Sequence, residues 1–491
     1  MARFENNNLE QGLFLSINLG EQFNENTREY HVKDFINKQV ELNKFEKYYK
    51  NDEKGRLIKN PKDMIAAILY GYITGNRSSR DVEELLQKNI GFMYVSNRLR
   101  VDHSVICDFK VRFKGLIEEL FAKLLYVLNN LNEIDWDIIV EVGTRIKANA
   151  SKSMNVGGEI TDKKLEIYRN MSRKIVERDL ENDQKYDDGA IDEKKYHNEK
   201  KRISRQKKLY EHMIEKIEEY KQSVKAGDLD GDEKYNLTDP ESKVRRGENR
   251  RTFIQGYNAL FALSNNDIIL DYRGDTESEK HGAEKIIRAV EEKKRELEEH
   301  KKTTYIMDSG FENMNTILKC QKRGIDVYIE LRETSFSGEA QKRKYFHDVE
   351  KRDNGYYLSC IGGRTVKGSI LGTHSKVSFS FRRKTCTGCT NYEQCYGKIK
   401  ETTKSKTVVF DLFEIENKEG ITQYISKLKS KEGRKIYHKR IGKEHVFANI
   451  KTQKGYHQTA YRGKEKLNME LGWISIAHNL MKYVNYQLSY G

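Results

Sequence analysis

Four side chains near the end of the chain are of types that suit chemistry on a phosphate backbone. Tyr437, Arg440, Glu444 and Lys451 stand at the spacing Tyr-x2-Arg-x3-Glu-x6-Lys. If the segment is helical, steps of three, four and seven residues place all four on one helix face. A carboxylate can hold a divalent metal, and arginine and lysine can hold phosphate oxygens. The set therefore predicts metal-assisted phosphoryl transfer on nucleic acid, with an ordinary solvated helix face as the alternative.

A second acid occupies a position from which it could join Glu444. Asp308 follows the short apolar run TTYIM, and Ser309 and Gly310 after it allow a tight turn. Acids at the carboxyl ends of strands lie at the edge of an α/β sheet, where metals and ligands bind. Asp308 and Glu444 could share Mg²⁺ or Mn²⁺ ions that activate a water or a 3′-hydroxyl and stabilise the leaving oxygen. Glu470 is a second choice for the acid from the C-terminal part.

The composition favours a nucleic-acid partner. The 491 residues include 90 Lys and Arg against 75 Asp and Glu, a formal net charge of +15, and such a basic balance suits a polyanion. No apolar run approaches the ~18 residues of a membrane span, and the first residues lack the apolar core of a signal peptide. We therefore expect a cytoplasmic protein with no membrane partner.

Residues 1–130 are expected to form an all-α DNA-binding domain, because apolar residues recur there at helical spacing. Basic residues surround one predicted turn, which is typical of a helix-turn-helix reader. The alternative is the basic solvated face of an ordinary helical bundle. The basic residues are Arg98, Arg100, Lys110 and Arg112.

The pattern of strands and helices that follows indicates an α/β core. Residues 131–332 are expected to form its first part, with a charged helical insertion at 155–250 that suits a hairpin or short coiled coil. Residues 333–430 are expected to be a β-rich insertion, because they combine Gly, Ser and Thr with β-like runs. Residues 431–491 are expected to be the C-terminal helical part of the core.

Four of the six cysteines fall in the β-rich insertion. Cys386, Cys389 and Cys395 follow the pattern Cys-x2-Cys-x5-Cys, and Cys360 lies upstream. The Cys-x2-Cys unit and the two further cysteines could supply four thiolates to a structural Zn²⁺. Reduced free thiols are the alternative, and His374 is a possible replacement ligand.

Several motifs, in their order along the chain, resemble those of bacterial insertion-sequence DDE transposases, closest to the eleven-eighty-two family with its Tyr-Arg-Glu-Lys box. The resemblance covers about residues 55–485. It implies an RNase H-like core that binds terminal inverted repeats of DNA, and Mg²⁺-dependent cleavage and strand transfer by an Asp, Asp, Glu triad. It also implies a homo-oligomer on DNA, associated with the bacterial nucleoid, and similar cysteines before the Glu. The motifs are GTRIKANAS (143–151), LTDPES (237–242), GYNALFAL (256–263), MDSGF (307–311), the Tyr437–Lys451 box and AHNL (477–480).

Two members of the implied triad match and one does not. Asp308 matches the second Asp and Glu444 matches the Glu, but the position of the first Asp holds Val142. Glu141 is adjacent, yet side chains alternate along a strand, so it should point to the opposite face. Asp137 is five residues before Val142 and has the same wrong parity. We therefore expect a transposase with impaired catalysis.

The resemblance also gives roles to the remaining residues of the box. Arg440 and Lys451 are expected to contact phosphate or the flanking DNA, and Tyr437 to stack on a base or bind a phosphate, with core packing as the alternative for Tyr437. A catalytically inactive DNA-binding protein, a repressor or co-opted factor, is the main rival function. An RNase H-like nuclease outside transposition is a weaker one.

Overall fold

A mixed β-sheet forms the centre of the computed structural model, which describes residues 18–46, 48, 58–230, 233–247, 251–276, 279–331, 346–372, 375–396, 404–453 and 455–490. The sheet has the order β4-β5-β1-β7-β8, and β6 also pairs with β5. β1 runs antiparallel to β5 and parallel to β7, which is parallel to β8. The expected mixture of helices and sheet is therefore present. The strands are β1 (Ile138–Lys147), β4 (Lys243–Arg246), β5 (Phe253–Ser264), β6 (Ile269–Asp275), β7 (Thr304–Met307) and β8 (Asp326–Ile329).

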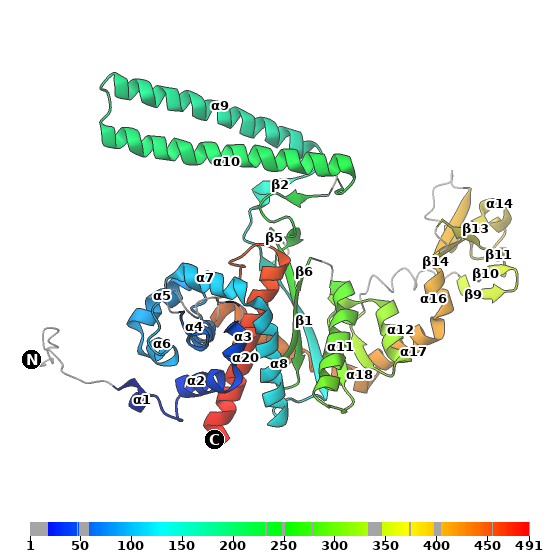
Figure 1. Cartoon of the computed structure of the whole chain (residues 1–491). Coiled ribbons are helices and arrows are strands. Elements are labelled where there is room, and N and C mark those ends of the chain that lie inside the picture. The colour runs from blue at the N-terminus through cyan, green and yellow to red at the C-terminus, as the bar shows by residue number, and fades with distance from the viewer. Residues whose placement is uncertain are drawn as a thin grey trace, which may run out of the picture.

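Helices cover both faces of this sheet (Figure 1). α11 (Glu279–Glu296) and α12 (Met314–Lys322) lie on one face, and α8 (Lys114–Asn130) and α20 (Lys464–Tyr490) lie on the other. The first five residues of β1, IIVEV, are all buried. A strand that is covered on both faces favours such a continuous run over an alternating pattern.

The N-terminal helices pack directly onto α20 and the sheet. Almost every side of α4 is buried, so neighbours must surround it. A single apolar core joins Ile68 of α4, Leu480 of α20 and Val140 of β1. The packing of this part is thus continuous across residue 130. The helices are α1 (Leu19–Gln22), α2 (Arg28–Gln39), α3 (Asn43–Glu46), α4 (Pro61–Ile73), α5 (Ser79–Lys88), α6 (Ile90–Val95) and α7 (His103–Arg112).

A long helical hairpin projects from the carboxyl end of β1 (Figure 1). α9 (Glu159–Asp187) and α10 (Glu193–Ala226) follow η1 (Lys152–Met154) and stand on the short pair β2 (Asn155–Val156) and β3 (Tyr235–Asn236). Leu165 and Ile175 of α9 and Ile203, Met213 and Ile217 of α10 are buried between the helices. Ion pairs such as Arg169–Glu218 cross the seam. The charged segment, predicted as a hairpin or short coiled coil, is thus a hairpin of two long helices.

The β-rich insertion has a small core of its own around Leu358, Val377 and Phe379. It consists of two three-stranded sheets, of order β11-β10-β9 and β12-β13-β14. The helix α17 that follows already belongs to the main core, because Tyr424 is buried there. The β-rich part therefore ends before residue 430. Its elements are β9 (Phe346–Arg352), β10 (Gly355–Cys360), β11 (Thr365–Lys367), β12 (Ser369–Leu371), β13 (Lys376–Arg382), α14 (Arg383–Cys386), α15 (Tyr392–Tyr396) and β14 (Ser405–Asp411), followed by α16 (Leu412–Glu416) and α17 (Lys418–Lys429).

The segment from Tyr437 to Lys451 is not one continuous α-helix, so the predicted single helix face is wrong. α18 (Lys431–His438) ends before Arg440, and η3 (Ile441–Lys443), α19 (Glu444–Ala448) and a π-helical turn, η4 (Asn449–Gln453), follow. At the break, the buried Lys443 ammonium donates to Asp267 Oδ1 at 2.7 Å and to the Asn265 carbonyl, and these contacts with a distant segment fix the turn to the sheet. Among the helices of the described ranges, none is long and apolar enough to cross a membrane.

Candidate functional site

Val142 and Asp308 lie side by side on one face of the central sheet. In the parallel pairing of β1 with β7, Glu141 stands opposite Met307, so the next step of the register sets Val142 beside Asp308. In the antiparallel pairing of β1 with β5, Val142 stands opposite Phe261. Neighbouring residues across strands point to the same face. Val142, Asp308 and Phe261 therefore share a face.

Asp308 presents a partly exposed carboxylate at the end of β7. Its Oδ1 accepts a hydrogen bond from Gly310 N at 2.5 Å and caps the short helix η2 (Ser309–Phe311). Its Oδ2 lies 3.9 Å from a terminal guanidinium nitrogen of Arg440, and 40% of the side chain is exposed. The acid thus follows a strand, as the sequence predicts, and lies next to a cation of the predicted box.

The segment that carries Glu444 crosses the same face of the sheet. Phe447 of α19 packs edge-on against Phe261, with ring centroids 5.5 Å apart, and Lys443 is anchored to Asp267 beside the β5–β6 turn. The backbone of Glu444 lies between these two contacts. Its side chain is outside the described atoms, so the structure places the helix start but not the carboxylate.

The other residues of the box have different surroundings. The Arg440 guanidinium lies 5.9 Å from the ring centre of Tyr437, and Arg440 Nε is buried without a hydrogen-bond partner among the described atoms. Tyr437 is half-buried against the main core, and this burial raises the pKa of its hydroxyl. Lys451 is buried, and burial together with nearby Arg145 lowers the pKa of its ammonium.

Neither Glu141 nor Asp137, the two acids weighed as replacements, supplies a third carboxylate on this face. Val142 is 5% exposed and has only an apolar side chain. Glu141 is buried on the opposite face, where its Oε1 is 3.9 Å from the point at which Gly282 of α11 would carry a Cβ atom. Asp137 precedes β1, and its backbone carbonyl accepts from Thr304 N at the far end of β7. The alternation of side chains along β1 thus keeps Glu141 away from Asp308.

Glu470, the second choice for the metal-binding acid, lies in a different part of the molecule. It is 1% exposed and accepts from Ala460 N at 3.1 Å and from Tyr456 Oη at 3.3 Å. Burial raises the pKa of Glu470 to about 7, although Ala460 N–H, Arg77 and Lys110 oppose the shift. Its two hydrogen-bond donors lie in the segment before α20, and Arg77 and Lys110 belong to the N-terminal part, so Glu470 stabilises the interface between these segments and does not face Asp308.

Lys110 does not lie on a DNA-facing surface, which corrects the prediction for this residue. It is 2% exposed, donates to the Arg77 carbonyl at 3.2 Å and lies 5.0 Å from the ring centre of Tyr72. Burial lowers the pKa of Lys110 to about 8. The sequence missed this because α7 packs its Lys110 side against α4 and α20, which are distant in sequence.

The other N-terminal cations remain at the surface. Arg98 and Arg100 are exposed, and Arg98 adopts a left-handed backbone conformation with φ 57°. Arg112 is exposed as well, donates to the Tyr48 carbonyl and stacks over the Phe113 ring at 5.5 Å. These three arginines can reach a polyanion, and Arg112 also holds the segment around Tyr48 against α7.

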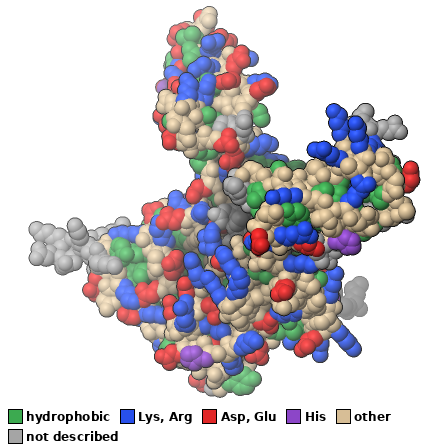
Figure 2. Space-filling view, turned by 90° about the vertical axis from the view of Figure 1, so that its right-hand side faces the viewer, with side chains coloured by type: hydrophobic (Ala, Val, Ile, Leu, Met, Phe, Trp, Pro, Cys, Tyr) green, Lys and Arg blue, Asp and Glu red, His purple; other side chains and the backbone are tan. Residues whose placement is uncertain are grey.

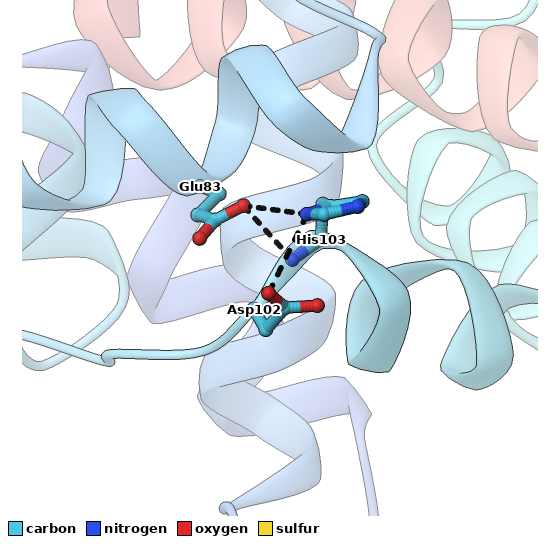
Figure 3. Close-up of side chains that lie close together, drawn as sticks. All are labelled: Glu83, Asp102 and His103. Carbon is cyan, nitrogen blue, oxygen red and sulfur yellow. Dashed lines mark hydrogen bonds and ion pairs between the residues drawn. The ribbon is translucent and has the colours of Figure 1, made fainter. Parts of the chain in front are cut away.

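A separate group of possible metal ligands lies in the N-terminal helices (Figure 3). Ligand atoms of Glu83, Asp102 and His103 lie within 4.8 Å of one another. Glu83 Oε2 accepts from His103 N at 3.1 Å and lies 2.9 Å from His103 Nδ1, while Asp102 caps α7 through Ser104 N. The group thus joins α5 to the start of α7, and it had no signal in the sequence pattern.

The four cysteines of the β-rich insertion surround one cavity of about 30 Å³. All six cysteines are free thiols. Within the described ranges, no three of these sulfurs lie within 4.8 Å of one another, as the ligand atoms of Glu83, Asp102 and His103 do. His374 lies outside the described residues. The structure therefore places the four thiols around one cavity, but their sulfurs do not converge to the distances of a metal site.

Two family models match parts of the chain. Residues 359–484 match a transposase DDE domain, and residues 17–112 match a transposase domain (DUF772). No curated protein and no solved structure matches the chain. Glu444 lies inside the first matched range, whereas Val142 and Asp308 lie outside both. The two matched domains support an insertion-sequence DDE transposase, as the sequence resemblance predicts, but they do not test the eleven-eighty-two family.

Proposed function

We propose that the protein is an insertion-sequence transposase of the eleven-eighty-two family that binds the terminal inverted repeats of its element. Its fold is built for Mg²⁺-dependent cleavage and strand transfer, and Val142 impairs that chemistry. The observation that carries the proposal is the sheet face on which Val142 adjoins Asp308, Arg440 approaches Asp308, and the start of α19 crosses above.

The architecture supports an RNase H-like core. Asp308 follows a strand that is parallel to β1, and helices cover both faces of the mixed sheet. The two long insertions hold small apolar cores of their own. The catalytic elements are therefore kept together by the main core alone.

The residues on this face do not fit a complete two-ion site. Asp308 would hold a divalent cation, joined by Glu444 from α19, and Mg²⁺ prefers such oxygen ligands. A pair of ions a few ångströms apart needs a carboxylate that bridges them, and the apolar side chain of Val142 offers no oxygen. The chain as it stands therefore lacks one of the oxygen ligands that a two-ion site requires.

The cations around this face supply contacts for DNA. Arg440 lies beside Asp308. Burial and the nearby charge of Arg145 lower the pKa of the Lys451 ammonium, and a bound phosphate would offset that effect. Figure 2 shows further Lys and Arg side chains over the body of the molecule on the side of the β-rich insertion. Arg98, Arg100 and Arg112 would contact the backbone from the N-terminal helices, and a homo-oligomer would hold the two ends of the element together.

The competing function is a DNA-binding protein without catalysis, a repressor or co-opted factor, and Val142 is the observation that favours it. Binding to the element's own ends tests what the two functions share. We expect tight binding to the terminal repeats, weaker binding to a scrambled duplex of the same length, and affinity that falls steeply with salt. Equal affinity for the two duplexes at physiological salt would contradict both functions.

A further inference from the structure

We propose that Cys360, Cys386, Cys389 and Cys395 bind one structural Zn²⁺ in the β-rich insertion. The four thiols come from the end of β10, from α14 and the turn after it, and from α15. All four line the same cavity of about 30 Å³, which is room for a single ion or water molecule. Structural zinc sites take four ligands, and four thiolates are a common set.

A tight backbone turn joins Cys386 to Cys389, and both thiols line the cavity. Cys389 N donates to the Cys386 carbonyl at 3.1 Å, and Tyr392 N donates to the Cys389 carbonyl at 3.0 Å. Gly388 within the turn has φ 106°, in the region that favours glycine. The chain thus reverses tightly, which brings the two thiols to one side of the turn.

Cys360 approaches the same turn from β10. A Cβ atom at Gly362 would stand 2.7 Å from Cys389 Sγ and 3.7 Å from Cys360 Sγ. Both sulfurs therefore lie against one glycine, whose missing side chain leaves the space between them open. Each cysteine side chain can turn about χ1, and this rotation is the movement by which the sulfurs would reach the distance of about 2.3 Å from Zn²⁺ that thiolates adopt.

The charge around the cavity suits a zinc–thiolate centre. When Zn²⁺ binds, each of the four thiols releases its proton to water and forms a Zn–S bond, and the product carries two negative charges. The ammonium of Lys406 lies 3.2 Å from Cys395 Sγ, and Arg364 lines the same cavity. Cations at this distance stabilise thiolates and orient metal ligands.

A bound metal ion would also stabilise the fold of the β-rich insertion. Its apolar core is small, is separate from the main core, and includes Cys386 itself. Small units with few buried side chains are commonly stabilised by a metal. β14 leads from this unit through α16 and α17 to the segment that carries Arg440. A bound ion would therefore stabilise the unit from which this connection to the sheet face starts.

Metal analysis of the purified protein tests the site without reference to DNA cleavage. We expect about one Zn²⁺ per chain after growth in zinc-sufficient medium and purification with a reductant and no chelator, released by about four equivalents of a thiol-specific mercurial. Cys389→Ser and Cys395→Ser should lose the ion, while Cys107→Ser, outside the insertion, should keep it.

Two results would overturn the zinc site. One is wild-type protein with negligible zinc whose six cysteines all react with the mercurial and release no metal. The other is zinc that persists in a Cys389→Ser, Cys395→Ser double variant. Because the mercurial titration uses wild-type protein, the site can be tested even if the variants fail to fold.

Discussion

The sheet face around Asp308 and the interface around Glu470 contain the same kinds of residue in opposite environments. Each has a carboxylate, an arginine and a tyrosine. Asp308 is 40% exposed and lies 3.9 Å from its cation, whereas Glu470 is 1% exposed and bound by two hydrogen-bond donors. Residue types alone therefore do not distinguish a functional site from a structural contact. The exposure of the carboxylate and the segments that supply its partners do.

The largest expected difference between the two regions is in catalysis. In a Val142→Asp background, Asp308→Asn should reduce cleavage of the element's ends by about 10³-fold or more, because it removes a metal ligand. Glu470→Gln in the same background should keep most of the activity. Cleavage rates measured at a fixed Mg²⁺ concentration compare the two. An equal loss from both variants would break the distinction.

The second difference is in how stability depends on pH. Glu470 has a pKa of about 7 in the folded protein against about 4.3 in an unfolded chain. As the pH rises, the Glu470 carboxyl loses its proton in the unfolded chain before it does so in the folded protein. It therefore stabilises the folded state most below about pH 4.3, and its contribution to the free energy of unfolding falls by roughly 3 kcal/mol as the pH rises to about 7. The charged and titratable groups that face Glu470 include Arg77, Lys110 and Tyr456. The decrease in unfolding free energy that Glu470 causes should end near pH 7.

Urea unfolding of wild type and of Glu470→Gln at pH 5 and pH 7.5 measures this contribution. The difference in unfolding free energy between the two proteins should shift with pH in the stated direction. Asp308→Asn, whose carboxylate is partly exposed, is the matched control and should follow the wild type. A constant difference between wild type and Glu470→Gln would mean that Glu470 is already ionised at pH 5.

The smallest expected effect separates a DNA-facing cation from a buried one. Arg440→Gln should reduce the slope of log affinity against log salt by about 1, because one phosphate contact is lost. Lys110→Met should leave the slope unchanged, since its ammonium is enclosed by α4 and Arg77. Titration of labelled element ends at several salt concentrations gives both slopes. A reduced slope for Lys110→Met alone would reverse the assignments.

Local periodicity accounts for what the sequence could predict. The alternation of β1 predicted the opposite faces of Glu141 and Val142, and the apolar run before Asp308 predicted its strand end. The long charged stretch indicated the helical hairpin of α9 and α10, but not that β4, inside the range 155–250, pairs with β5 in the central sheet. Each of these depends on residues that are close together in the chain. They therefore leave a pattern that one sequence can show.

Packing between distant segments accounts for what the sequence could not predict. Lys110 is buried because α7 meets α4 and α20, and the Tyr437–Lys451 segment is broken because Lys443 binds Asp267. The group formed by Glu83, Asp102 and His103 joins two helices whose approach has no periodic signal. The charge and size of a side chain do not reveal which distant segment will cover it.

The central claim is that Val142 occupies the position of a missing metal ligand beside Asp308. The most direct test compares wild type and Val142→Asp in cleavage of the element's own ends with Mg²⁺, with the Val142→Asp, Asp308→Asn double variant as the control. The account predicts little or no cleavage by wild type, a gain of about 10³-fold or more in Val142→Asp, and loss of that gain in the double variant. Robust Mg²⁺-dependent cleavage by the wild type, at a rate that Val142→Asp does not raise, would contradict it.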